Sequence, residues 1–172
     1  YAEDQGVFLF DALARPWHLL VPFGGYEQLM PRLVGQLVSY LPLADAAVPY
    51  ALAGAGIAAL CALFIYHAMD GWIRSPWLRA LAGVALILLP LAPIEIADSA
   101  VGAPWYVLTA LFFALLWRPK TRAGMTAAAL VAFAAASSEI LAVIYAPLVL
   151  LRLVVLPRWR EHAVTAGWLA GL

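Results

Sequence analysis

Cysteine and charge are both scarce in this sequence. Its single cysteine, Cys61, lies in an apolar run, so no internal disulfide or thiolate metal site can form and we expect a buried, inert thiol. Charged residues make up 12% of the 172 residues and hydrophobic residues 66%, with a mean hydropathy of +0.92. Soluble domains average about 25% charged and about 45–50% apolar residues. Because a soluble domain of this size cannot bury so much apolar surface, the composition predicts an integral membrane protein.

Several motifs of soluble enzymes are also missing. No basic patch carries interleaved aromatic residues, so we expect no nucleic-acid partner. A phosphate-cradling glycine-rich loop and a nucleophile elbow are absent, which leaves cytoplasmic nucleotide chemistry unsupported. His18, His67 and His162 share no metal-binding spacing, and we predict structural roles for all three.

Long apolar runs dominate the chain from residue 46 onward. Ala46 to Met69 contains no Asp, Glu, Lys or Arg and exceeds the about 20 residues that cross a bilayer. Further candidates are Leu78–Ile96, interrupted by Pro90 and Pro93; Ser99–Trp117, with Trp105, Tyr106 and Trp117 as interfacial anchors; Ala123–Leu156; and the start of another at Ala163–Leu172. The fold class predicted is all-α, a polytopic transmembrane helical bundle forming one domain over residues 1–172. Because the chain starts without methionine and stops within an apolar run, we expect it to be part of something longer.

The run from Ala123 to Leu156 has two interpretations. Ser137, Ser138 and Glu139 lie near its middle, so it forms either two short spans or one long helix with a buried glutamate. Two spans place most basic residues on one side, which is typical of the cytoplasmic face. We therefore favour the hairpin, which gives about five spans within 46–172. The basic, cytoplasmic side then holds Arg74, Arg79, Arg118, Lys120, Arg122, Arg152, Arg158 and Arg160, with the acids Asp70 and Glu161. The acidic, outer side holds Glu3, Asp4, Asp11, Glu27, Asp45, Glu95, Asp98 and Glu139, with the bases Arg15 and Arg32.

The first 45 residues are too polar to cross a bilayer and too apolar for a soluble loop. A stripe at helical spacing is formed by Leu29, Leu33, Leu37 and Leu41 with Met30, Val34 and Val38. Away from it lie Glu27, Arg32, Gln36 and Ser39. This pattern predicts a helix on the membrane surface within an outer loop. A shorter helix is predicted for Gln5 to Ala14, ended by Pro16, with a turn at Pro22 to Gly25.

Paired acids are the strongest candidates for chemistry. Glu3 and Asp4 are adjacent at the start of this segment, and Glu95 and Asp98 share a face if their loop is helical. Such carboxylates can act as a general base, bind a cation or hold a sugar hydroxyl. The alternative is that they are solvated residues that only mark the outer side. Glu139 would face a polar cavity, because a free carboxylate at membrane depth is costly.

A few other polar residues are candidates for substrate binding. Arg32 could hold a phosphate through its guanidinium, although snorkelling from an interfacial helix is the commoner explanation for such an arginine. Tyr26 and Glu27 follow the Gly24-Gly25 turn and could line a pocket. Arg15 and Arg32 are the only basic residues assigned to the outer side.

The order of acidic pair, surface helix, Gly/Pro turn, second surface helix and span resembles membrane glycosyltransferases with the GT-C fold. Protein O-mannosyltransferases and bacterial lipid A aminoarabinose transferases belong to this class. The runs YAEDQGVFLFDAL and PFGGYEQLMPRLVGQLVSYLPL look like those of actinobacterial polytopic proteins of the class. The proline-flanked histidine found in many O-mannosyltransferases is absent from Pro22 to Tyr26.

The resemblance implies an enzyme acting on a polyprenyl-phosphate sugar, with its site in the first outer loop. Asp4, with Glu3 beside it, takes the position of the catalytic acid, and Glu95 and Asp98 match a metal position of one branch. Some branches use a divalent cation, Mg²⁺ or Mn²⁺, and others none. The hypothesis is transfer of a sugar to a cell-envelope acceptor at the outer face of the plasma membrane. The alternatives are a transporter or lipid flippase using Glu139 and the Pro90–Pro93 break, and a non-catalytic membrane scaffold.

Overall fold

The computed structural model describes residues 4–88, 102–155 and 162–172, with the backbone alone for Asp4, Gln5, Leu86 and Leu88, and these residues are largely helical. The described residues contain no β-strand, only an isolated antiparallel bridge between Phe23 and Tyr26. The helices are η1 (Asp4–Leu9), α1 (Phe10–Ala14), α2 (Leu29–Val38), η2 (Leu43–Asp45), α3 (Ala47–Ala68), η3 (Met69–Gly71), α4 (Pro76–Leu88), α6 (Ala103–Leu116), α7 (Arg122–Ala136), η5 (Ile140–Tyr145), α8 (Ala146–Val155) and α9 (Ala163–Gly171). The all-α prediction is confirmed for these residues.

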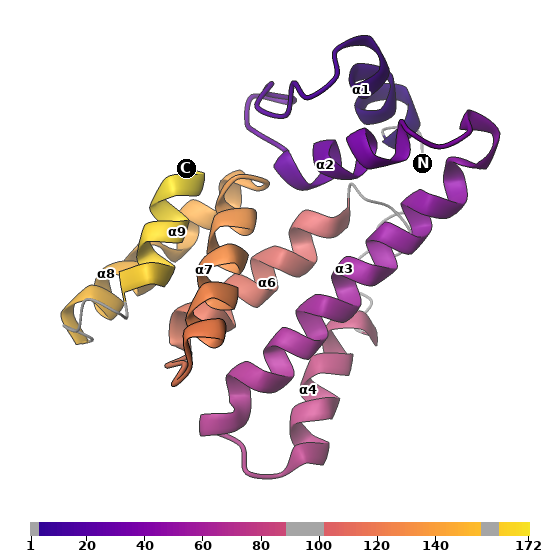
Figure 1. Ribbon diagram of the computed structural model, residues 1–172. Coiled ribbons are helices and arrows are strands. Elements are labelled where there is room, and N and C mark those ends of the chain that lie inside the picture. The colour runs from indigo at the N-terminus through magenta and orange to yellow at the C-terminus, as the bar shows by residue number, and fades with distance from the viewer. Residues whose placement is uncertain (1–3, 89–101, 156–161) are drawn as a thin grey trace.

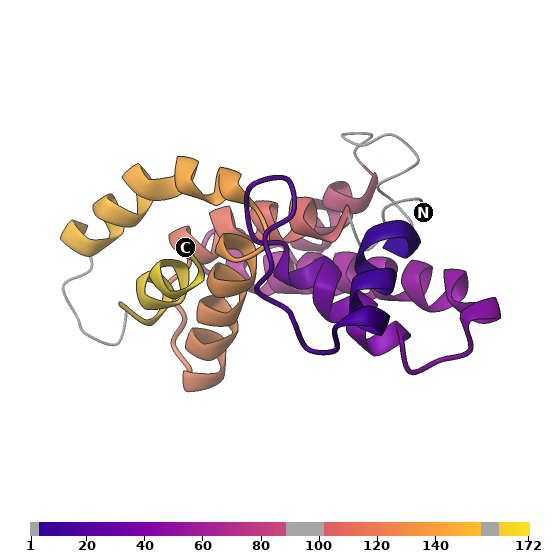
Figure 2. The same ribbon diagram turned by 90° about the horizontal axis from the view of Figure 1, so that it is seen from above.

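The longer helices form a bundle whose members run up and down between two ends (Figure 1). Helix α3 packs against α4 and α6, α6 against α7, and α7 against α9. One end, called here the α1–α2 end, is covered by α1 and α2, and α2 lies across the bundle helices (Figures 1 and 2). The turns 69–75 and 117–121 lie at the opposite end, called here the basic end because 117–121 carries Arg118 and Lys120.

Small residues form most of the contacts between the bundle helices. The core includes many fully buried alanines on α6 and α7, namely Ala103, Ala110, Ala114, Ala128, Ala132 and Ala135. Gly167 and Gly171 of α9, spaced as G-x-x-x-G, lie on α7 so closely that a Cβ on Gly171 would be 2.6 Å from the carbonyl oxygen of Phe133. Such close backbone approach through small residues is typical of helix packing in membranes.

The outer faces of the same helices are apolar. Exposed large hydrophobic residues on α3, α4 and α8 include Leu52, Leu60, Trp77, Leu81, Leu150 and Val154. Helix Ala47–Gly71, with 25 residues, is the one described helix long and apolar enough to cross a bilayer. Three other apolar segments, Ala103–Leu116, Arg122–Ala136 and Ile140–Val155, have 10–17 residues, shorter than the about 20 needed for a crossing.

The helix predictions agree with the structure in most places. The run from Ala46 to Met69 is helical, Gln5 to Ala14 is helical and ends before Pro16, and the turn before Tyr26 has positive φ at Gly24 and Gly25. The chain between Ala123 and Leu156 breaks after Ala136, so the single long helix is wrong and α7 and η5–α8 are separate. Cys61 is buried, as predicted. Much of the predicted span Leu78–Ile96, including Pro90 and Pro93, lies outside the described residues, as do Arg158, Arg160 and Glu161.

Two predictions about individual side chains need correction. Tyr106, expected as an interfacial anchor, is only 9% exposed and belongs to the core between α6 and its neighbours. On α2, Arg32 and Gln36, which were expected to lie away from the leucine stripe, are buried because η1 and α1 cover that face, and Glu27 and Ser39 beside the helix are half-buried. Leu37 is instead 65% exposed. The structure therefore buries polar residues of α2 as well as much of its apolar stripe, at Leu29, Val34 and Val38, while Leu37 of the stripe points outward.

Arg152 of α8 is buried and holds the end of α6. Its Nη1 donates hydrogen bonds to the carbonyl oxygens of Leu115 (2.5 Å) and Trp117 (2.8 Å). These carbonyls belong to the last turn of α6, where a cation offsets the helix dipole. Arg152 therefore joins the two helices at the basic end.

We expect Arg152→Gln to lower the free energy of unfolding by about 1.5–3 kcal/mol, the range for a hydrogen bond to a charged group. Reversible unfolding in mixed micelles measures this change, with Arg118→Gln as the control because Arg118 is exposed at the same end. Equal effects of the two substitutions would mean that Arg152 acts only through net charge.

Candidate functional site

A small polar cavity lies at the α1–α2 end, where α1 and the segment after it cover α2. Its lining residues come from η1 and α1, from the loop after α1, and from α2. They are Phe8, Asp11, Ala12, Arg15, His18, Leu19, Arg32 and Gln36. The space inside is about 10 Å³, close to what one water needs. Arg15 and His18 are exposed and form a polar outer rim of the cavity.

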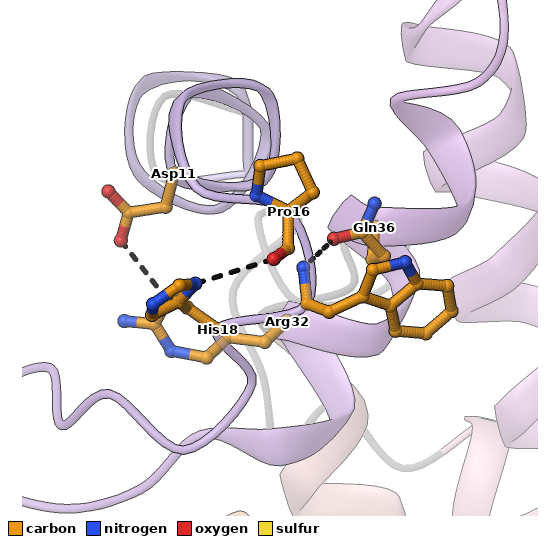
Figure 3. Close-up of polar contacts among 6 residues, drawn as sticks. Asp11, Pro16, His18, Arg32 and Gln36 are labelled. Atoms are coloured by element: carbon orange, nitrogen blue, oxygen red, sulfur yellow. Dashed lines mark hydrogen bonds and ion pairs between the residues drawn. The ribbon is translucent and has the colours of Figure 1, made fainter.

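The chain reversal after α1 places these residues. The backbone N–H of Arg15 donates to the carbonyl of Asp11 at 2.8 Å, and Pro16 then stops the helix because it has no N–H to donate. Trp17 adopts a positive φ of 66°, and its N–H donates to Oε1 of Gln36 at 2.7 Å (Figure 3). Gln36 thus fixes the loop that carries His18 against α2.

Arg32 is the central cation of the site. It is 5% exposed, and its Nη1 donates to Oδ2 of Asp11 at 3.1 Å (Figure 3). Its guanidinium carbon also lies 5.6 Å from the centre of the Phe8 ring, within the range of a cation–π contact. Its buried Nε finds no hydrogen-bond partner among the described residues. Arg32 therefore has donor capacity that the described protein groups leave unused.

The charge balance of this cavity favours an anion. Arg15 and Arg32 supply two guanidinium groups, and Asp11 is the one carboxylate in the lining. His18 adds a ring nitrogen at the rim, and its Nδ1 lies 3.3 Å from the carbonyl oxygen of Pro16. Guanidinium groups bind phosphate oxygens through paired N–H donors, so the lining carries donors of the type that phosphate groups use.

An apolar groove adjoins the cavity. It has a volume of about 460 Å³ and is lined by Trp17, His18, Leu19, Leu20, Val21, Leu29 and Phe133. His18 and Leu19 line both spaces, so the cationic cavity and the groove are neighbours. A charged cavity about the size of one water and an apolar groove therefore lie side by side.

The start of α2 is held by the turn after α7. The N–H of Leu29 donates to the carbonyl of Ser137, and the N–H of Met30 donates to Oγ of Ser138, both at 3.1 Å. These bonds satisfy two N–H groups that the first turn of a helix leaves free. These bonds hold α2 against the end of α7, so Leu29 and Phe133, which line the apolar groove, have fixed positions relative to each other.

Glu139 follows in this turn and is only 6% exposed. Its Oε1 accepts a hydrogen bond from the N–H of Leu141 at 3.3 Å, so its carboxylate caps η5. Glu139 lies at the end of α7 rather than within a helix, and it does not line the cationic cavity. It is therefore close to α2 but has a structural role in the contacts seen.

The other predicted site residues are only partly brought together. Arg15 and Arg32 share the cavity, whereas Tyr26 and Glu27 are half-buried just before α2 and line neither space. The backbone of Asp4 begins η1, which packs against α2. Glu3 and the predicted metal ligands Glu95 and Asp98 lie outside the described residues. Among residues that are described, no group of three or more His, Cys, Asp or Glu side chains could hold a metal ion.

Asp11, His18, Gln36 and Phe8 were not singled out as site residues from the sequence. Two signals could have identified three of them. Asp11 and Arg15 are four residues apart, and so are Arg32 and Gln36, which places each pair on one helical face. Phe8 lies three residues before Asp11 on the same face. Asp11 on the face of α1 and Arg32 on the face of α2 have opposite charges, which suggests that the two helices pack together through these faces.

Comparisons of this chain with protein-family models, with curated proteins and with solved structures found no match. The chemistry of the α1–α2 end therefore has to support the functional conclusion by itself.

Proposed function

We propose that this chain belongs to a multi-span membrane glycosyltransferase that moves a sugar from a polyprenyl-phosphate donor to a cell-envelope acceptor. The observation that carries the proposal is the cationic cavity around Arg32 beside an apolar groove. A polyprenyl phosphate has the same two parts, a phosphate and a long apolar chain. The resemblance of the first 45 residues to GT-C enzymes implies the same donor class.

Membrane placement is supported by the apolar outer faces of the helices and by the small residues between them. The distribution of charge agrees with it. The turn 117–121 and the start of α7 carry Arg118, Lys120 and Arg122 at the basic end, while Asp11, Glu27, Asp45 and Glu139 belong to segments at the α1–α2 end (Figure 1). By the positive-inside tendency, the basic end faces the cytoplasm and the candidate site faces outward across the plasma membrane.

The proposed reaction inverts the anomeric carbon. Asp4 takes the proton from the acceptor hydroxyl as its oxygen attacks that carbon, and the bond to the polyprenyl phosphate breaks. The phosphate leaves with the bonding electrons, and Arg32 and Arg15 stabilise its developing charge. Glu3 orients the acceptor. Glu95 and Asp98 remain the residues proposed to hold a divalent cation, in case the chain follows the metal-dependent branch.

The structure gives the transporter alternative less support. A midplane site would need Glu139 unpaired within a span, whereas its carboxylate caps η5 at the end of α7. The phosphate site therefore remains the better basis for a functional proposal.

Donor binding tests the role of Arg32. We expect the purified chain in phosphatidylcholine nanodiscs to bind a polyprenyl phosphate more tightly than the corresponding polyprenol, which lacks the phosphate. Arg32→Gln should weaken phosphate binding by about 10- to 100-fold, because a hydrogen bond to a charged group contributes about 1.5–3 kcal/mol. Tryptophan fluorescence titration measures both affinities.

Two further variants separate binding from folding. Arg15→Gln changes an exposed residue at the rim and should also weaken phosphate binding without affecting the fold. Arg74→Gln removes the same charge in the turn 69–75 at the basic end and should leave binding unchanged. Equal affinity for polyprenyl phosphate and polyprenol in the unmodified chain would refute the proposed donor site.

A further inference from the structure

A second and larger groove runs between α7 and α9. Its volume is about 710 Å³, and its lining is almost entirely apolar, with Met125, Ala129, Phe133 and Ala166 among its residues. Arg122 and His162 lie at one end, where α7 and α9 both begin. The groove is thus apolar along its length and basic at one end.

The charge at that end is positive over several residues. Arg118, Lys120 and Arg122 occur within five positions without an intervening acid. Asp70, an acid of the neighbouring turn, is paired with Arg79 on the α3–α4 side. Glu161, which precedes His162, is outside the described residues. The positive charge at this end of the groove is therefore assigned to Arg122 of α7.

The length of the groove fits one leaflet of a bilayer. From Arg122 to Phe133 the helix advances 133 − 122 = 11 residues, which is about 16 Å at 1.5 Å per residue. Half of a typical hydrocarbon core is about 15 Å. A lipid whose phosphate lies at Arg122 would therefore place its acyl chain along the apolar part of the groove and end near Phe133.

We propose that the α7–α9 groove binds an anionic phospholipid, with its phosphate at Arg122 and one acyl chain between Met125, Ala129 and Ala166. This site differs from the proposed donor site, because its headgroup contact at Arg122 lies at the opposite end of α7 from the donor groove and its ligand stays intact. Its positive end selects an anionic headgroup over a zwitterionic one. Phe133 lines both this groove and the groove near Trp17, so α7 contacts both proposed lipid sites.

Electron paramagnetic resonance with chain-labelled lipids tests the proposal. The protein is placed in phosphatidylcholine vesicles that contain spin-labelled phosphatidylglycerol or spin-labelled phosphatidylcholine, and the motion-restricted fraction gives the relative affinity. We expect a clear preference for phosphatidylglycerol. Arg122→Gln should reduce that preference about fivefold, the effect of about 1 kcal/mol per basic residue near the membrane surface. Arg74→Gln, which removes an equal charge from the turn 69–75, should not.

A steric pair of variants tests the position of the acyl chain. Ala166→Trp fills the groove and should lower the restricted fraction, whereas Leu169→Trp changes an exposed position that is not part of the groove lining. If both tryptophans have the same effect, or if phosphatidylglycerol shows no preference, the groove is not an anionic-lipid site. Arg122→Gln should leave polyprenyl-phosphate binding unchanged, because Arg122 does not line the donor site, so failure here and failure of the donor site can be told apart.

Discussion

Replacement of Asp4 by Asn is expected to lower sugar transfer by about 10²- to 10⁴-fold, the usual contribution of a general base. The amide keeps the size of the side chain but cannot accept the proton of the acceptor hydroxyl. Asp4 begins η1, the helical segment that continues through Phe8 toward Asp11 and packs against α2. Its backbone therefore begins the helical segment that contributes Phe8 and Asp11 to the proposed phosphate site.

The measurement is a transfer assay in membranes that contain the whole protein, with a panel of radiolabelled polyprenyl-phosphate sugars. Asp45→Asn is the matched control, because Asp45 is an exposed acid in η2, just before α3. Loss of transfer in Asp4→Asn alone, at equal expression, would support the catalytic assignment. Equal transfer by both variants would show that Asp4 is not the base.

Glu139→Gln separates the remaining functions in the same membranes. A transporter that uses Glu139 should lose ion-coupled uptake in this variant, while a transferase should keep its transfer activity at matched expression. Because Glu139 caps η5, the neutral amide retains an oxygen that can accept the hydrogen bond from Leu141. A scaffold would show neither activity in the unmodified protein.

The second large effect is expected at the contact between α7 and α9. Replacing both Gly167 and Gly171 by alanine should destabilise the protein by about 1–3 kcal/mol for each substitution, the usual cost of overpacking. A Cβ on Gly167 would overlap the carbonyl oxygen of Ala129, and one on Gly171 would be 2.9 Å from Cβ of Ala136. Backbone atoms cannot move aside as a flexible side chain can, so the two helices must separate.

Gly56 of α3 provides the opposite expectation. A Cβ added there meets nothing within 4 Å, and alanine is favoured over glycine in a helix by about 1 kcal/mol. Gly56→Ala should therefore be neutral or stabilising in the same unfolding experiment. If Gly167→Ala stabilises the protein as Gly56→Ala is expected to, helix propensity rather than packing governs the effect of residue 167 of α9 on stability.

Much of the secondary structure could be predicted from the sequence, since its signals are local. The absence of charge from Ala46 to Met69 predicts α3, Pro16 predicts the end of α1, and Gly24-Gly25 predicts the turn. The break at Ser137 to Glu139 followed from charge placement along the chain rather than from hydropathy alone. Each of these inferences depends on residues close together in sequence.

The candidate site was only half predictable for the same reason. Arg15 and Arg32 were recognisable as the basic residues of the first segment, but the pairing of Arg32 with Asp11 and Phe8 depends on how α1 folds back onto α2. The leucine stripe of α2 suggested which face is apolar, and the structure buries much of the polar face. A polar face can be buried when another segment satisfies its hydrogen bonds, as Asp11 and the Trp17 N–H do here.

Composition and periodicity by themselves thus determined that this protein is helical, highly apolar and segregated in charge along its length. Tertiary structure decided which faces meet: α1 on the polar face of α2, Ser137 and Ser138 under the start of α2, and Gly167 and Gly171 on α7. Periodicity fixes the faces of a helix because it is set by about 3.6 residues per turn. The partner of each face depends on the packing of segments far apart in the chain, which no local pattern specifies.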